Sequence, residues 1–242
     1  MKFVGADGCK DGWFTVQLST NHEWEINIFR DICSLWNTLK DNSTQDFLIL
    51  IDIPIGLKES TSNERLCDKQ ARKLLGKRKR GSVFRAPCRQ SLSEDTYESA
   101  SRLNQKITGK NLTKQAFAIS SKIGDVDDYM HNYPAKQHVI EVHPELCFYG
   151  LAGHPMEFNK KKREGFLERK DTLIQYCEST NAIIDSALSK YKRKQVSRDD
   201  ILDALSAAVT AKLCHKYGFT FIPENPEFDD KGLPMQIVYS KN

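Results

Sequence analysis

The sequence has no long hydrophobic run, and this absence argues against a transmembrane helix. None of its 242 residues belongs to a stretch approaching the roughly 18 apolar residues that a transmembrane helix requires. The N-terminal segment MKFVGADGCKDGW turns polar after four residues, which is too short for the hydrophobic part of a signal peptide. We therefore expect neither membrane association nor secretion.

The cysteines lack any close pairing. Seven of them are scattered along the chain with no CxxC pair, which excludes a zinc knuckle. An odd, dispersed set without a secretion signal indicates reduced thiols, so we expect a cytoplasmic location.

A strong excess of either charge is also missing. Lys and Arg total 36 and Asp and Glu total 32, and a net charge of +4 does not by itself indicate nucleic-acid binding. Hydrophobic residues make up 39% of the chain and charged residues 28%, which is typical of a folded domain. The length allows one large α/β domain, or one domain with a substantial insertion.

The stretch Phe47–Leu57, FLILIDIPIGL, is the clearest structural signal in the chain. Its apolar run is closed by Pro54 and Gly56, which predicts a strand buried on both faces of a parallel or mixed sheet. Three strands and an amphipathic helix are predicted before it, at Phe3–Gly8, Trp13–Leu18, Trp24–Phe29 and Asp31–Leu39. The resulting β-β-β-α-β order implies an antiparallel meander followed by a parallel strand.

The segment Lys58–Tyr133 differs in composition, being rich in Ser, Lys and Arg. We predict a single domain over 1–242 with a mostly helical insertion at about 58–133. The insertion is expected to hold helices at Asn63–Leu75 and Thr113–Ile123, with an irregular loop at Gly76–Pro87. After it we predict strands at His138–Val142 and Met235–Tyr239, a helix opening at His143 and Pro144, and helices at Phe166–Ala187 and Asp199–Tyr217.

Acidic residues lie at the ends of the predicted core elements. Asp7 closes the first strand, Asp52 the fourth and Glu141 the fifth, while Asp200 and Asp203 share one face of the last helix. Sites form at the carboxyl ends of strands in open α/β sheets. Carboxylates are also the hard oxygen ligands that Mg²⁺ and Mn²⁺ prefer. We therefore predict a catalytic centre of these five acids, with the four aspartates as metal ligands.

The last helix also carries a stripe of small side chains, namely Ala204, Ala207, Ala208 and Ala211. Small residues let a helix press closely on a sheet, so we expect Asp203 to point toward the sheet margin.

Most of these acids also have a purely structural interpretation. Asp7 precedes a glycine and Asp52 precedes a proline-containing turn, so either can stabilise a turn. Ser197 and Asp200 have the spacing of a capping box. Glu141 faces outward if strand alternation places it opposite the core. The prediction therefore depends on several acids converging from distant segments.

Several segments together resemble the DUF429 family of predicted ribonuclease-H-like nucleases. They are GADGCKDGWF, LIDIPIGL, CDKQARKLLG with SVFRAPCR, EVHPELCF and DDILDALSAAVTA. The last is also similar to the final helix of RuvC-type resolvases, whose two acids fall on Asp200 and Asp203. The resemblance implies a ribonuclease-H-like α/β fold, with a five-stranded mixed sheet in the order 3-2-1-4-5 and flanking helices. It also implies divalent metal bound by Asp7, Asp52 and the acids of the last helix.

Basic residues supply candidates for substrate binding. Three basic runs can contact phosphates or can form solvated surface, namely Lys77–Arg80, Lys160–Arg163 and Lys190–Lys194. Arg85 and Arg89 are stronger candidates because a guanidinium holds a phosphate with two hydrogen bonds. His143 is a further candidate, although it can equally serve only to open a helix.

We therefore expect a metal-dependent nuclease that hydrolyses phosphodiester bonds of DNA or RNA, with Mg²⁺ or Mn²⁺ as cofactor. A nucleic-acid-binding module with a vestigial site is one alternative. Another is an ATP-handling phosphotransferase of the sugar-kinase and actin type, which needs two such domains, whereas this chain has one strand-Asp-Gly loop. Nucleic acid is the expected partner, and a homodimer is one candidate assembly.

Overall fold

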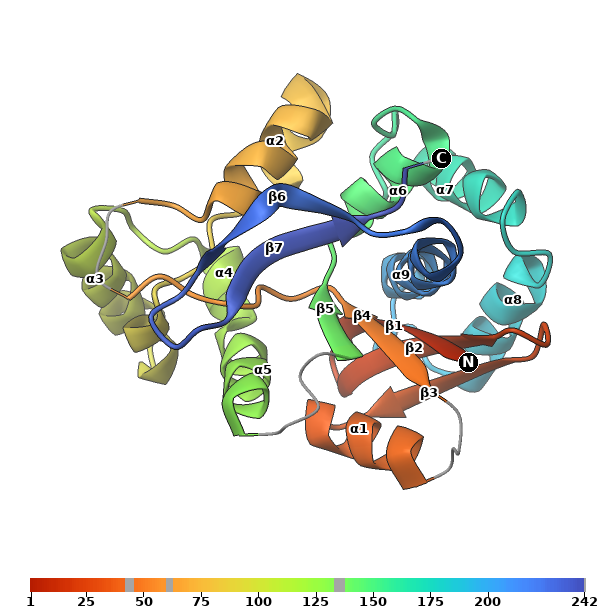
Figure 1. Cartoon of the computed structure of the whole chain (residues 1–242), viewed down its shortest axis with the longest axis horizontal. Coiled ribbons are helices and arrows are strands. Elements are labelled where there is room, and N and C mark those ends of the chain that lie inside the picture. The colour runs from red at the N-terminus through yellow and green to blue at the C-terminus, as the bar shows by residue number, and fades with distance from the viewer. Residues whose placement is uncertain (42–45, 60–62, 133–137, 242) are drawn as a thin grey trace. The chain divides into compact units, whose positions relative to one another are not determined.

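A five-stranded mixed sheet in the order β3-β2-β1-β4-β5 organises the first part of the structure (Figure 1). Strands β1 (Lys2–Cys9), β2 (Gly12–Ser19) and β3 (Trp24–Phe29) form an antiparallel meander. Strand β4 (Phe47–Ile51) pairs in parallel with β1, and β5 (Val139–Glu141) pairs in parallel with β4. The predicted strand order is confirmed, and every residue of β4 is buried as its apolar run predicts.

The computed structural model describes residues 1–41, 46–59, 63–132 and 138–241. The chain divides into two compact units. The first comprises Met1–Asp52, Gln137–Thr220 and Val238–Asn242, and the second comprises Ile53–Lys136 and Phe221–Ile237. The predicted insertion, about 58–133, falls in the second unit, and its residues 60–62 and 133 lie outside the described part.

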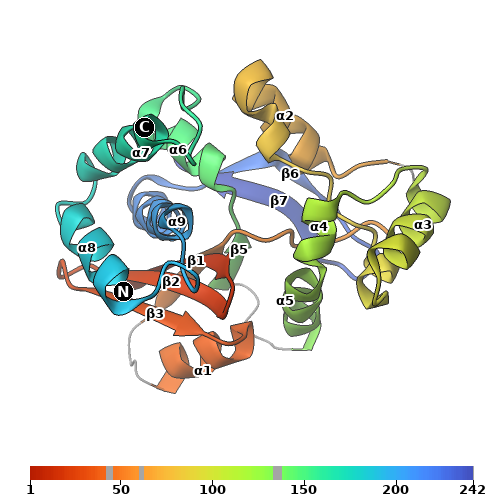
Figure 2. The same cartoon turned by 180° about the vertical axis from the view of Figure 1, so that it is seen from behind.

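Helix α9 (Arg198–Tyr217) covers one face of the sheet, and α1 (Ile32–Asp41) lies on the other (Figures 1 and 2). All residues from 201 to 211 of α9 are buried. Gly5 of β1 makes this close approach feasible, because a Cβ there would lie 2.0 Å from the carbonyl oxygen of Ala204 and 2.3 Å from the backbone nitrogen of Ala208. The small residues on both surfaces thus set the distance between helix and sheet.

Helices α6 (Pro144–Ala152), α7 (Arg163–Ile174) and α8 (Thr180–Lys190) form an arc around α9 (Figure 2). The prediction of one helix over Phe166–Ala187 was wrong, because α7 and α8 are separate. The chain turns between them, where the carbonyl of Cys177 accepts hydrogen bonds from the backbone N–H and the hydroxyl of Thr180. No glycine or proline marks this turn, which is why the sequence pattern missed it.

The second unit is mostly helical, as predicted. Its elements are α2 (Leu66–Lys79), the short 3-10 helices η1 (Arg80–Ser82) and η2 (Arg89–Ser93), α3 (Tyr97–Thr108), α4 (Lys114–Ala118), α5 (Ser120–Asn132), and most of the hairpin of β6 (Thr220–Phe228) and β7 (Pro234–Tyr239).

Several boundaries in the second unit differ from the prediction. Helix α2 passes through a kink at Gly76 (φ 63°, ψ −169°) and includes part of the predicted loop. The predicted helix Thr113–Ile123 is two helices that meet at Ile119, where the backbone leaves the helical conformation. Helix α3 and strand β6 were not predicted.

We predict that Gly5→Ala destabilises the chain by about 1–3 kcal/mol, the usual range for overpacking a well-packed interior. The added methyl group would overlap the backbone of α9, so the helix would have to move away from the sheet. Urea unfolding followed by circular dichroism measures the loss.

The matched control for Gly5→Ala is Gly124→Ala. Gly124 lies inside α5, and a Cβ there meets nothing within 4 Å. Alanine should therefore stabilise that helix by about 0.5–1 kcal/mol. Equal stability of the two variants would contradict the close packing of α9 on β1.

Candidate metal centre

Asp7 and Asp52 emerge from neighbouring strands at the same edge of the sheet. Ala6 pairs with Ile51 in the parallel register, and the backbone N–H of Asp52 donates to the carbonyl of Ala6 at 3.0 Å. Gly5 faces α9, and Asp7 lies two positions further along β1. The side chain of Asp7 therefore points to the same face of the sheet as Gly5. The two carboxyl groups are close enough for the charge of Asp52 to raise the pKa of Asp7.

Helix α9 brings a third carboxylate to this edge. Asp203 is 3% exposed and lies one turn before Ala207, whose Cβ would be 2.9 Å from a Cβ at Gly5. It therefore faces the sheet, on the side where Asp7 lies. We call Asp7, Asp52 and Asp203 the acid cluster.

Asp200 forms the capping box that the sequence left open as an alternative. Its two carboxylate oxygens accept hydrogen bonds at 2.7 Å from the backbone N–H and the hydroxyl of Ser197, and its own N–H donates to that hydroxyl at 3.2 Å. Its charge still contributes to the raised pKa of Asp7. A capping role is therefore present, and metal ligation by Asp200 stays a prediction.

The acid cluster is electrostatically unfavourable as it stands. Burial, followed by the charges of Asp203, Asp52 and Asp200, raises the pKa of Asp7 well above its usual range. Burial also raises the pKa of Asp52, although His143 and Lys160 oppose it. Burial raises the pKa of Asp203 to about 6, in spite of the nearby Lys160. Such a cluster favours a bound cation or a bound proton.

Lys160 is the cation that the structure supplies to this cluster. Its Nζ lies 2.6 Å from Oδ2 of Asp203. Burial alone would lower the pKa of Lys160, but Asp203, Asp7 and Asp52 together raise it. The sequence showed Lys160 only as the first member of a basic run, and nothing in that run distinguishes it from Lys161.

Glu141 and His143 flank the same edge of the sheet. Glu141 pairs in register with Ile51 and is 5% exposed, so the solvent-facing alternative does not hold. His143 is the N-cap of α6, and its Nδ1 accepts a hydrogen bond from the backbone N–H of Glu145 at 3.2 Å. This leaves Nε2 as the nitrogen that can donate. Substrate binding by His143 stays a prediction, with a donor role the one this geometry allows.

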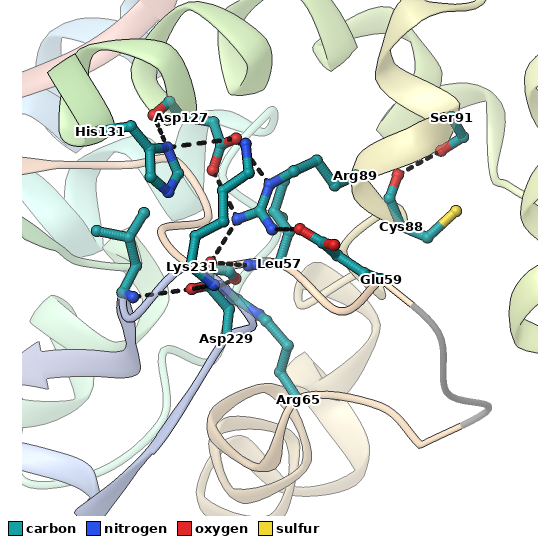
Figure 3. Close-up of polar contacts among 12 residues, drawn as sticks. Leu57, Glu59, Arg65, Cys88, Arg89, Ser91, Asp127, His131, Asp229 and Lys231 are labelled. Carbon is teal, nitrogen blue, oxygen red and sulfur yellow. Dashed lines mark hydrogen bonds and ion pairs between the residues drawn. The ribbon is translucent and has the colours of Figure 1, made fainter.

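Arg85 and Arg89 belong to the second unit, whereas the acids belong to the first. Arg89 lies among three carboxylates (Figure 3). Its Nε and Nη2 donate to Asp127 at 2.8 and 3.0 Å, and further hydrogen bonds go to Asp229 and Glu59. We call this group the Arg89 cluster. Phosphate binding by Arg89 would compete with these bonds, and for both arginines it stays a prediction.

A second group of potential metal ligands shares Asp127 and Asp229 with the Arg89 cluster and adds His131. Asp127, His131 and Asp229 each offer a ligand atom, and these atoms lie within 4.8 Å of one another (Figure 3). Arg89 already neutralises both carboxylates, so an ion would have to displace its guanidinium. Within the described residues, the three carboxylates of the acid cluster do not meet this spacing together.

The donor set of the acid cluster fits Mg²⁺ or Mn²⁺ chemically. All three side chains offer hard carboxylate oxygens, and Asp7 and Asp52 emerge from paired positions of neighbouring strands. Asp203 is turned toward Lys160. Two of the three carboxylates therefore form the core of the candidate site.

The comparisons with known proteins give one match. The family model described as "Protein of unknown function (DUF429)" covers residues 5–227. No curated protein and no solved structure matches the chain. In the described part of the chain, no helix combines the length and the apolar character needed to cross a membrane.

We predict that Asp7→Asn stabilises the metal-free chain at neutral pH. A carboxyl group whose folded pKa is raised costs stability once the pH exceeds its unfolded pKa, and the amide carries no such charge. In EDTA at pH 7.5 we expect a gain of about 1 kcal/mol, roughly 2–4 °C in Tm for a chain of this size. The gain should disappear below about pH 3, where the carboxyl group is protonated in both states.

The control for Asp7→Asn is Asp185→Asn, which changes an exposed acid of α8 in the same unit. It should leave the Tm within the error of thermal denaturation. A loss of stability in Asp7→Asn at pH 7.5 would contradict the account of a repulsive acid cluster.

We predict that Arg89→Met lowers the stability of the second unit by about 3–5 kcal/mol, because three carboxylates lose their shared cation. Arg102→Met is the control, since Arg102 is exposed on α3. Urea denaturation measures both variants. Comparable stability of the two variants would show that the Arg89 cluster contributes little.

Proposed function

The chain belongs to the DUF429 family, and we propose that it is a divalent-metal-dependent nuclease with a ribonuclease-H-like fold. One observation carries the proposal. Three carboxylates from β1, from the end of β4 and from α9, two of them buried and Asp52 half-buried, form a cluster in which the pKa of each acid is raised. Burying like charges together costs free energy, so such an arrangement is typical of a functional site.

The sheet supports the fold part of the proposal. An antiparallel meander β1–β3, followed by a helix and by the parallel strands β4 and β5, gives the order 3-2-1-4-5. This is the order that the resemblance to ribonuclease-H-like nucleases implies. The acids lie at the carboxyl ends of β1 and β4, where open α/β sheets form their sites.

The chemistry follows from the donor set. A bound Mg²⁺ or Mn²⁺ would lower the pKa of a water molecule and offset negative charge on the scissile phosphate. Asp7 and Asp52 would hold the ion, and Asp203 would complete the negative rim. Asp200 and Glu141 are proposed as supporting acids that add to the negative potential.

Exposed cations support nucleic acid as the substrate. Residues 161–163 and 192–194 are Lys or Arg and are all exposed, and both runs belong to the unit that holds the acids. The first run continues directly from Lys160, which contacts the acid cluster. Phosphate backbones attract such runs and release counterions on binding. Within the described residues the seven cysteines form no disulfide, which suits a reducing, cytoplasm-like compartment.

A second candidate function rests on the bond between Lys160 and Asp203. A lysine already engaged with one acid resembles an internal replacement for a metal ion. The chain would then bind nucleic acid without hydrolysing it. This candidate predicts binding that is independent of divalent metal.

The test is cleavage of labelled single-stranded and structured DNA and RNA at millimolar Mg²⁺ or Mn²⁺. Removing a hydrogen-bond partner of a metal ligand costs about 10–100-fold, so removing a ligand itself should cost more than about 100-fold. We therefore expect Asp52→Asn to lose more than about 100-fold of the cleavage rate. Binding, measured by fluorescence anisotropy in EDTA, should be retained.

The matched control is Asp46→Asn, at the opposite end of the same strand, where the side chain is exposed. It should cleave at the wild-type rate. Undiminished cleavage by Asp52→Asn would overturn the site assignment. Metal-independent binding without cleavage by the wild type would favour the second candidate.

A further inference from the structure

Hydrogen bonds with α7 fix the segment that carries Lys160. The carboxylate of Glu168 accepts hydrogen bonds from the backbone N–H groups of Glu157 and Phe158, at 2.6 and 3.0 Å. Nη1 of Arg169 donates to the carbonyls of Phe158 and Gly165, at 3.3 and 3.0 Å. Two adjacent residues of one helix thus hold the chain just before the lysine.

Hydrogen bonds within the segment also form a turn. The N–H of Lys162 donates to the carbonyl of Asn159, and the N–H of Lys161 donates to its side-chain oxygen, both at 2.9 Å. A Cβ at Gly165 would lie 2.1 Å from the same carbonyl, so only glycine lets α7 begin this close to the turn. Lys160 therefore projects from a fixed turn.

Arg169, one of the two α7 residues that fix this segment, carries a buried charge. Arg169 is fully buried, and its Nη2 donates to Glu145 of α6 at 2.6 Å. An unpaired guanidinium would be costly there, and Glu145 offsets that cost. The same ion pair joins α6 to α7. The ammonium of Lys160 is therefore held beside Asp203 by a network that extends through two helices.

The net charge of the acid cluster and Lys160 indicates how many divalent ions are needed to neutralise it. Asp7, Asp52 and Asp203 contribute three negative charges, and Lys160 returns one positive charge. Asp200 lies outside the cluster, where it accepts hydrogen bonds from Ser197 at the N-terminus of α9 and adds to the negative potential. Glu145 is compensated by Arg169. The acid cluster and Lys160 together keep two negative charges, which a single divalent ion neutralises.

Taking the proposed metal centre as given, we infer that Lys160 replaces one of two divalent ions, so that the centre binds a single Mg²⁺ or Mn²⁺. A carboxylate centre for phosphodiester chemistry can hold two ions about 3.5–4 Å apart. In this chain Asp7 and Asp52 would bind the ion, and the ammonium of Lys160 would stand beside Asp203 in place of the second ion. Lys160 is a positioning residue that supplies fixed positive charge next to the ion.

The experiment counts Mn²⁺ ions bound to the full chain after removal of metal with EDTA. Isothermal titration and electron paramagnetic resonance of free Mn²⁺ give the number of ions. Each chain is compared with the same chain carrying Asp52→Asn, so that ions bound elsewhere, including at the Arg89 cluster, cancel. The chains are wild type, Lys160→Met and Lys161→Met, the last changing an exposed neighbour in the same run.

We expect one Asp52-dependent ion in the wild type and in Lys161→Met, and two in Lys160→Met. Two Asp52-dependent ions in the wild type would overturn the inference while leaving the nuclease proposal intact. A single ion in a folded Lys160→Met would also overturn it. No Asp52-dependent ion in any chain would overturn the metal centre itself. If Lys160→Met does not fold, the wild-type count still decides.

Discussion

The contact between Gly5 of β1 and the backbone of α9 is the constraint on which the candidate site depends. A side chain at Gly5 would meet the carbonyl of Ala204, so the helix reaches the sheet only because none is present. This approach places Asp203 beside the edge where Asp7 and Asp52 emerge. The same closeness buries Asp7 and Asp203 and half-buries Asp52, and this burial raises the pKa of each. Packing and electrostatics are thus two results of one short distance.

The two units handle buried charge in opposite ways. In the acid cluster, burial and like charges raise the pKa values, so the cost is absent below about pH 3 and grows until the pH passes each folded pKa, which is about 6 for Asp203. In the Arg89 cluster, burial opposes the shift, but the N–H of Leu233 and the guanidinium of Arg89 lower the pKa of Asp229. Its contribution is present above pH 4 and is lost as the pH falls through the lowered pKa. Acid therefore relieves the first unit and weakens the second.

Local patterns predicted much of the fold and the outline of the site. The apolar run of β4, the meander before it and the alanine stripe of α9 each reflect burial of residues close in sequence. They were sufficient for the β-β-β-α-β succession and for the expectation that Asp203 points toward the sheet margin. The sheet order 3-2-1-4-5 and the joint site of Asp7, Asp52 and the last helix were expected from the resemblance to the DUF429 family. The patterns failed at residues 175–179, where no glycine or proline marks the turn. They also missed α3, which lies in the highly charged segment, and β6, whose Pro223 and Pro226 argue against a strand.

The sequence by itself determined which carboxylates lie at the ends of core elements, because strand ends and helix starts are marked by neighbouring residues. Only the tertiary structure decided which cations meet them. Lys160 and Asp203 are 43 positions apart, and Arg89 and Asp229 are 140 apart. Neighbouring basic residues have the same charge and a similar local context. Their roles depend on how a braced turn or a helix end directs each side chain, and that is set by contacts distant in sequence.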